Sequence, residues 1–303
     1  MSKCVLLPYK YQPILTAQSV KEHANWGVKQ FDFSKIWNYT LGEGVKTAVL
    51  DTGVDTNHED LQTCLLNGYN FIDDNDNPYS ENEHGTHIAG ILSAQHNHLG
   101  VIGIAPKSKI VPVKVLDDDG IGDVESIVKG IEFSINEKVD FILLSLGTTE
   151  PEPILRHTIR KAKKKGIITF AAAGNMGLSE HLLYPANYPE TIAVGAIDSK
   201  LKRAVYSNTG NNLDFLAPGD KILSTIPKNK YGILSGSSMA NPFACGLAIL
   251  ILSYQKKIQN DFRNNLLYMK DILKSKSIHI ENELQSNQGY GIINTDCFFN
   301  LVR

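Results

Sequence analysis

The sequence lacks the features that mark membrane-spanning or nucleic-acid-binding proteins. No apolar run approaches the roughly 20 residues that cross a bilayer, and the longest lies near Leu247 to Leu252. Thirty basic and 32 acidic side chains leave a net charge of -2, so no overall excess of positive charge would attract nucleic acid. The one notable basic run, residues 160–165, is interrupted by Ala162 and is typical of a solvated helix face.

Cysteine is scarce, and no two cysteines are close in the sequence. The four are Cys4, Cys64, Cys245 and Cys297. This spacing matches neither a zinc ribbon nor a disulfide framework, so we expect reduced thiols. A secretory signal is also lacking, because Pro8 interrupts the short apolar stretch within residues 1–16 and no small-residue cleavage site is present. We therefore expect a cytoplasmic protein that binds neither membranes nor nucleic acid.

Short β-branched apolar runs alternate with helical patterns along most of the chain. Five runs are typical of buried strands: 47–50, 109–115, 141–145, 167–172 and 191–194. Residues 122–137 and 153–165 show the apolar spacing of crossover helices. Parallel strands need such crossovers, so the order predicts a doubly wound α/β sheet in one domain, residues 20–303. Residues 1–19 precede this alternation and form an N-terminal extension.

Three segments place reactive side chains at strand ends or helix starts, where α/β folds build their sites. In the first, a predicted strand ends at Asp51, and Gly53 permits a tight turn behind it. An aspartate in this position could equally cap a helix. Taken alone, this segment leaves both interpretations open.

The second segment is His84-Gly85-Thr86-His87, followed by a helix of small residues. Paired histidines suggest a metal site, but helical metal pairs are usually four residues apart with a glutamate between them. Here the spacing is three and that glutamate is missing, which argues against a metal. A single core histidine would be the simpler reading, but two histidines flanking Gly and Thr need a further reason.

The third segment, residues 234–242, has Gly236 and Ser237 before Ser238 and then turns apolar and helical. A serine at the amino end of a buried helix is suited to nucleophilic attack, since its own N–H and the helix dipole face a developing oxyanion. Taken alone, capping of the helix by Ser237 or Ser238 explains the residues as well.

Together the segments present Asp51, His84 and Ser238 in the order of the subtilisin triad. The chain resembles the subtilisin family, closest to the intracellular subtilisins, with Ser237 where Thr is usual. The resemblance implies a serine endopeptidase with a three-layer fold, in which helices flank a mainly parallel sheet. It also implies that Asn175, in Ala171-Ala172-Ala173-Gly174-Asn175, donates to the oxyanion.

The resemblance further implies an extended substrate groove. The substrate would bind as an added strand along Gly120, Ile121, Gly122, Ser145, Leu146, Gly147, Ala172, Ala173 and Leu183. Small residues are common at the position of Leu183, so we expect a shallow primary pocket that accepts large aromatic side chains weakly.

Two further features follow from the resemblance. A structural calcium ion would be held by oxygen ligands from Asp60, Gln95, Asn97, Leu99, Val101 and Glu22. Leu6-Leu7-Pro8-Tyr9 is similar to the stretch that lies across the active site of intracellular subtilisin precursors. Proline fixes its own φ and lacks an N–H, so a short inhibitory propeptide is expected.

Two alternatives to a general intracellular protease stay open on the sequence. A dedicated leader-peptide processing protease would share the fold and triad. An inactive subtilisin-like binding protein normally would have lost a triad residue, and this chain retains all three. Intracellular relatives also suggest a homodimer.

Overall fold

The computed structural model describes residues 3–14, 22–177, 180–258 and 265–302. Its centre is a seven-stranded sheet in the order β11-β10-β9-β7-β3-β5-β4, with every neighbouring pair parallel. Its strands are β3 (Lys46–Asp51), β4 (Tyr69–Asn70), β5 (Lys109–Lys114), β7 (Phe141–Leu144), β9 (Ile168–Ala172), β10 (Thr191–Ile197) and β11 (Phe215–Pro218). The predicted doubly wound α/β sheet is therefore confirmed.

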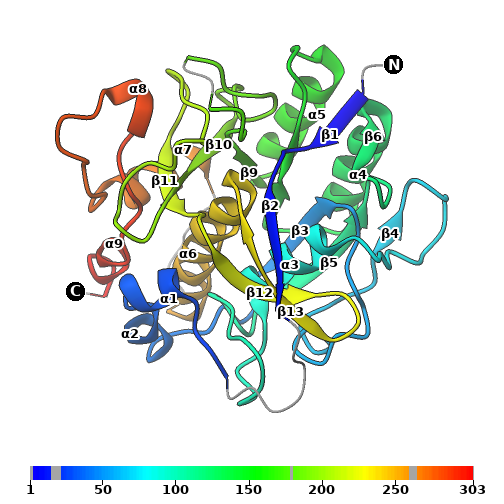
Figure 1. The fold of residues 1–303 in the computed structure, drawn as a ribbon, viewed down its shortest axis with the longest axis horizontal. Coiled ribbons are helices and arrows are strands. Elements are labelled where there is room, and N and C mark those ends of the chain that lie inside the picture. The colour runs from blue at the N-terminus through cyan, green and yellow to red at the C-terminus, as the bar shows by residue number, and fades with distance from the viewer. Residues whose placement is uncertain (1–2, 15–21, 178–179, 259–264, 303) are drawn as a thin grey trace.

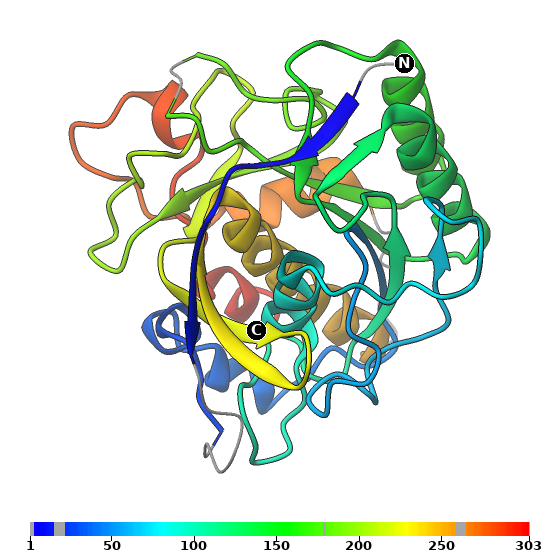
Figure 2. The same ribbon diagram turned by 45° about the vertical axis from the view of Figure 1, so that its right-hand side comes forward.

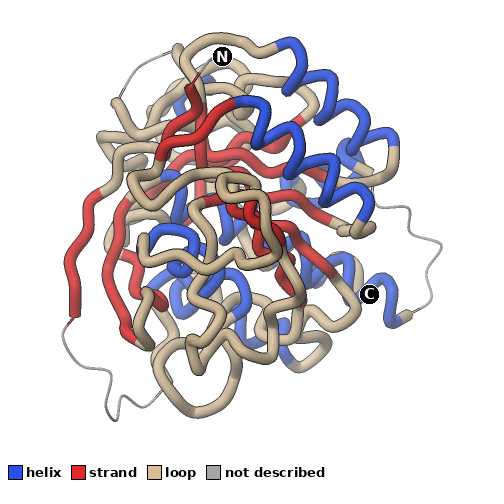
Figure 3. Tube along the Cα trace, turned by 90° about the vertical axis from the view of Figure 1, so that its right-hand side faces the viewer, coloured by secondary structure: helices blue, strands red, loops and turns tan. Residues whose placement is uncertain are grey.

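Helices cover both faces of this sheet, which makes the three layers. The helices are α1 (Trp26–Gln30), α2 (Phe33–Trp37), α3 (Glu83–Ser93), α4 (Val124–Asn136), α5 (Pro153–Lys164), α6 (Ser237–Lys257), α7 (Leu266–Lys274), α8 (Gln285–Gln288) and α9 (Asp296–Phe299). Helices α3 and α6 pack on one face, and α4 and α5 lie together on the other (Figure 3). Because successive strand residues point to opposite faces, Val49 joins the first core and Leu50 the second.

Helix α6 runs through the larger core (Figure 1). By length and composition, α6 could cross a membrane, yet 94% of its most apolar 18-residue window is buried inside the fold. This burial is what the central helix of a large domain requires, since an apolar surface all round needs partners on every side.

Two small antiparallel sheets join the N-terminal extension to the rest of the molecule. The first has the order β6-β1-β8 and consists of β1 (Lys3–Leu6), β6 (Ile121–Asp123) and β8 (Leu146–Gly147). The second has the order β12-β13-β2 and consists of β2 (Lys10–Ile14), β12 (Ile222–Ile226) and β13 (Lys230–Ser235). Residues 3–14 thus cross the front of the molecule as an extended chain (Figures 1 and 2).

Candidate active site

The three reactive side chains of the sequence analysis lie at the carboxyl end of the parallel sheet. Asp51 is the last residue of β3, and His84 and Ser238 are the second residues of α3 and α6. His84 Nδ1 lies 2.7 Å from Asp51 Oδ1, and both side chains are almost completely buried. A carboxylate on Nδ1 orients the imidazole and leaves Nε2 as the nitrogen that can accept a proton.

Local backbone geometry explains how these segments come so close. Gly53 has φ +101°, which glycine adopts without strain, and this turns the chain behind Asp51. A Cβ atom on Gly85 would lie 2.0 Å from the Gly53 carbonyl oxygen, so α3 can approach the turn only with glycine there. The Asn82 side chain caps α3 by accepting from the His84 N–H at 2.8 Å.

Ser238 is fully buried at the start of α6. Its Oγ donates to the Ser145 carbonyl at 3.4 Å, while His84 Nε2 has no hydrogen-bond partner among the described residues. The hydrogen bond from the Ser238 hydroxyl to His84 that would activate the nucleophile is therefore not formed in this structure. Such bonds often form only when substrate is bound.

Asn175 is held so that its amide nitrogen faces the groove. Its Oδ1 accepts from the Ser237 N–H at 2.7 Å, and its Nδ2 donates to the Pro8 carbonyl at 2.7 Å. Ser237 also steadies this loop, because its Oγ accepts from the Gly174 N–H at 3.1 Å. The serine found where Thr is usual therefore still supports the amide donor.

The N-terminal extension fills the predicted substrate groove. Strand β1 lies between β6 and β8, with Val5 opposite both Ile121 and Gly147. The Leu6 N–H donates to the Gly120 carbonyl at 2.9 Å. The remaining predicted groove residues also line this extended segment or the neighbouring loop: Gly122, Ser145, Leu146, Ala172, Ala173 and Leu183.

The extension does not lie in the groove as a cleavable peptide would. Leu7 is fully buried against Ala172 and Leu183 and so occupies the predicted primary pocket. The carbonyl that meets Asn175, however, belongs to Pro8. In a peptide poised for hydrolysis, one residue supplies both the pocket side chain and the carbonyl in the oxyanion hole. Here the two functions are split between neighbouring residues, a shift of one position.

The Subtilase family matches residues 42–291. The chain belongs to that family. It is 42% identical over 249 residues to the intracellular serine protease of Paenibacillus polymyxa, covering 80% of this chain and 76% of that protein. It is 36% identical over 294 residues to the major intracellular serine protease of Bacillus subtilis (strain 168), covering 93% and 91%. It is 41% identical over 257 residues to a subtilisin of Bacillus pumilus, covering 84% and 90%. This subtilase is therefore a serine endopeptidase.

The second histidine of the His-Gly-Thr-His segment has a structural role in this subtilase. His87 is fully buried, and its Nε2 lies 3.0 Å from the Ile222 carbonyl and 3.2 Å from the Gly232 carbonyl. Burial lowers the pKa of His87 to about 3, so the ring is neutral and ties α3 to β12 and β13. This agrees with the argument against a metal pair at His84 and His87.

The expected calcium ligands gather around one buried carboxylate. Asp60 is fully buried and accepts from Asn97 Nδ2 at 2.9 Å, the Val101 N–H at 3.0 Å and the Tyr231 hydroxyl at 2.9 Å. Glu22 accepts from the backbone N–H of Asn97 at 3.0 Å. No basic side chain forms an ion pair with Asp60 in the described part of the chain.

The other two predicted ligands belong to the same loop. Gln95 donates from its backbone N–H to the Asp60 carbonyl at 2.9 Å, and the Leu99 N–H donates to Asn97 Oδ1 at 2.9 Å. Within the described ranges, no cluster of three or more His, Cys, Asp or Glu side chains suited to a metal is present. Any ion here would therefore depend on backbone and amide oxygens beside the carboxylates, as calcium accepts.

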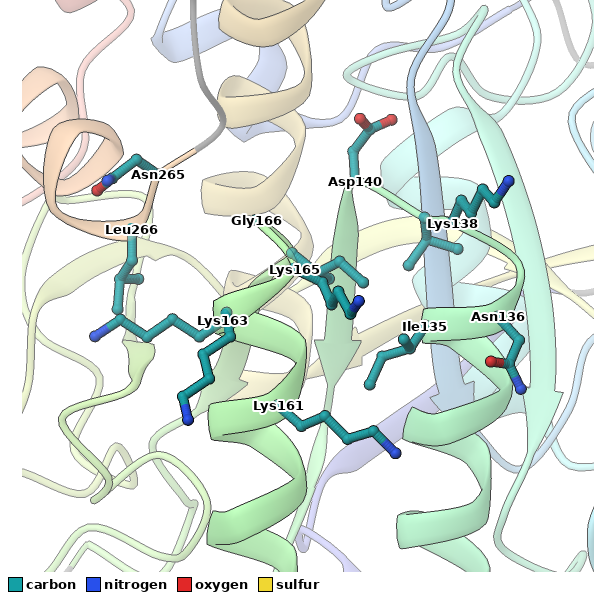
Figure 4. A pocket seen from close by; sticks show the side chains of 13 residues that line it. Ile135, Asn136, Lys138, Asp140, Lys161, Lys163, Lys165, Gly166, Asn265 and Leu266 are labelled. Atoms are coloured by element: carbon teal, nitrogen blue, oxygen red, sulfur yellow. The ribbon is translucent and has the colours of Figure 1, made fainter.

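A large basic cavity lies away from the triad. Its volume is about 970 Å³, and it opens at the carboxyl ends of α4 and α5 (Figure 4). Its lining includes Lys138, Lys161, Lys163, Lys164 and Lys165. The partial negative charge at helix carboxyl ends favours cations there, which accounts for these lysines. The predicted solvated face at residues 160–165 is confirmed, because only Ala162 of that run is buried.

Sequence reasoning missed one residue of the site, Glu83, and the contact that Tyr9 of the N-terminal segment makes with it. The Tyr9 ring lies 5.1 Å from the His84 ring, and the Tyr9 hydroxyl donates to Glu83 Oε1 at 2.9 Å. The available signal was an acidic residue directly before the histidine of the motif. Its partner, 74 positions earlier in the chain, could not be read from any local pattern.

Proposed function

We propose that this subtilase cleaves peptide bonds with Asp51, His84 and Ser238 as its triad and with Asn175 as a donor to the oxyanion. The supporting observation is the buried contact of 2.7 Å between His84 Nδ1 and Asp51 Oδ1, together with the burial of Ser238 at the start of α6. His84 Nε2 would accept the Ser238 proton as the hydroxyl attacks the peptide carbonyl, and would return it to the leaving amine as the C–N bond breaks. Water, deprotonated by the same His84, would then hydrolyse the Ser238 acyl-enzyme and release the carboxylic acid. Asp51 would stabilise the imidazolium that forms between these steps.

The extension of residues 1–19 acts, in this proposal, as an inhibitory propeptide. The shift between Leu7 in the pocket and the Pro8 carbonyl at Asn175 supports it, because no peptide bond of the segment presents both groups correctly. Tyr9 adds a ring beside His84. The boundary between residues 19 and 20 lies outside the described residues.

Covalent labelling by a fluorophosphonate serine probe tests both proposals. Wild type, Ser238→Ala and a chain lacking residues 1–18 would be compared, with folding checked by circular dichroism. Labelling that disappears in Ser238→Ala supports the nucleophile, and faster labelling of the shortened chain supports the propeptide. Absence of labelling in both folded chains that retain Ser238 would contradict the triad.

We infer that substrate replaces β1 as an added strand between β6 and β8. The backbone pairing of Val5 with Ile121 and Gly147 is the pattern that an extended substrate would reproduce. Leu183, packed against Leu7, supports a shallow pocket suited to aliphatic side chains of this size. Replacement of Leu183 by Gly should then raise kcat/KM for peptides with large aromatic side chains before the cleaved bond.

A structural calcium ion is the second part of the proposal. Asp60 is a buried carboxylate with no basic partner in the described part of the chain, and burial of such a charge is costly unless a cation compensates it. Asp60, Asn97 and Glu22, with the carbonyls of Gln95, Leu99 and Val101, would hold the ion. Its role would be to fix this loop beside the Tyr231 hydroxyl.

The names of two relatives, both intracellular serine proteases, support a location in the cytoplasm. A homodimer remains part of this proposal and is tested by sedimentation. Cleavage of a broad peptide library would support a general protease, and cleavage of a single sequence would support a dedicated processing enzyme.

A further inference from the structure

Glu83 is an acidic residue in the groove that the proposed mechanism does not use. It is the first residue of α3 and directly precedes His84. Among the described residues, the one hydrogen-bond partner of the Glu83 side chain is the Tyr9 hydroxyl, at 2.9 Å. No basic side chain in the described part of the chain forms an ion pair with the Glu83 carboxylate. When the N-terminal segment leaves, this half-buried carboxylate faces the groove without a partner.

Tyr9 marks the position that Glu83 would contact in a substrate. The Pro8 carbonyl lies on Asn175 Nδ2, so Tyr9 follows the carbonyl that occupies the proposed oxyanion hole. Its ring lies 5.1 Å from the ring of His84, the residue that returns a proton to the leaving amine in the proposed mechanism. The residue after the cleaved bond of a substrate would occupy the same place.

We propose that Glu83 is a specificity-determining residue, which selects substrates with a hydrogen-bond donor on the side chain that follows the cleaved bond. Tyrosine, lysine and arginine supply such a donor, and aspartate and glutamate would be repelled. The inference rests on the proposed triad, because it takes the carbonyl at Asn175 to mark the reacting position. The same contact would strengthen binding of the inhibitory segment.

An acidic residue in the first turn of a helix also stabilises the helix through its dipole. A test must separate this stabilising role from a role in substrate selection. The test uses the full chain carrying Leu7→Asp, so that the N-terminal segment leaves the groove free for peptides. A charge at position 7 cannot be buried against Ala172 and Leu183. Quenched peptides would differ only in the residue after the cleaved bond: Tyr, Phe, Lys, Leu or Glu. The measured quantity is the ratio of kcat/KM between peptides, which does not depend on the fraction of active enzyme.

With Glu83 intact, we expect kcat/KM for the Tyr peptide to exceed kcat/KM for the Phe peptide by about five-fold, because the tyrosine makes one hydrogen bond to a charged, partly exposed group. Glu83→Ala should reduce this ratio to about one. Glu83→Gln keeps an acceptor but removes the charge, so the preference for Lys over Leu should disappear while part of the Tyr preference remains. Glu81→Gln removes a nearby exposed charge paired with Lys228 and should change neither ratio.

A second measurement uses the wild-type segment as the ligand. Tyr9→Phe, Glu83→Ala and the double variant of the full chain would be compared by their rate of fluorophosphonate labelling. If Glu83 binds the Tyr9 hydroxyl, each single change speeds labelling and the double change adds little more. Additive effects of Tyr9→Phe and Glu83→Ala on the labelling rate would overturn the inference. A Tyr-to-Phe ratio of kcat/KM that is the same in Glu83→Ala as in its parent would also overturn it. Loss of all labelling in every folded variant would instead count against the proposed triad.

Discussion

Leu7 is the position at which binding of the proposed N-terminal inhibitor can be weakened without changing a reactive group. Its side chain is fully buried against Ala172 and Leu183. Exposing most of a leucine side chain to water costs about 2 kcal/mol, and Leu7→Ala forfeits that contribution only in the closed arrangement. Because 1.4 kcal/mol corresponds to a factor of ten, the open fraction should rise about 30-fold while closed molecules still predominate.

The rate of labelling by a fluorophosphonate probe measures this open fraction, since the probe reaches Ser238 only when the groove is free. Val5→Ala on the same strand is the matched control, because the Val5 side chain is 43% exposed and should contribute little. We expect less than a two-fold change for it. If Leu7→Ala labels no faster than Val5→Ala, with both folded, occupancy of the pocket by Leu7 does not hold the segment in place.

Four other outcomes follow from the site and its surroundings. Asp51→Asn should lower kcat about 10,000-fold with the fold intact, because the imidazole takes the wrong tautomer; steady-state kinetics on peptide substrate measures it. Asn175→Ala should lower kcat by roughly 100- to 1,000-fold, the magnitude known for loss of the corresponding donor in subtilisin. Removal of the proposed calcium ion by a chelator should lower the melting temperature by several degrees, and Asp60→Asn should abolish that response. For His87, the folded pKa of about 3 lies below the unfolded value of 6.5, so the unfolded chain gains a proton first as the pH falls. The free energy of unfolding should therefore drop below pH 6.5, by about 2 kcal/mol at pH 5, and chemical denaturation at pH 5 and 7 would detect it.

Much of the sheet was predictable because its strands are buried on both faces. Continuous apolar runs identified β3, β5, β7, β9 and β10, with ends shifted by a few residues. Strands β12 and β13 were not predicted. Ser224 and Thr225 of β12 donate their hydroxyls to the carbonyls of His87 and Thr86 in α3. Polar contacts between segments so far apart in the sequence cannot be detected from hydrophobic periodicity.

The candidate site was likewise predictable only in part. Asp51, His84 and Ser238 were found because short motifs fix their surroundings, and the structure pairs His84 with Asp51. The shift between the Leu7 side chain and the Pro8 carbonyl was not predictable. It depends on where the segment pairs with two strands that lie more than 100 positions away. Proline in the segment suggested only that cleavage there would be poor.

The covalent connection of β1 and β2 to the rest of the chain has a consequence for how the enzyme can be switched on. A tethered ligand acts at an effective concentration set by its linker, commonly in the millimolar range for short flexible connections. If residues 1–19 are the proposed inhibitor, each molecule carries it at a level that dilution cannot reduce. A free peptide substrate at micromolar concentration would compete poorly with it. Onset of activity should depend on cutting or displacing the segment, and be independent of enzyme concentration where that step occurs within one molecule.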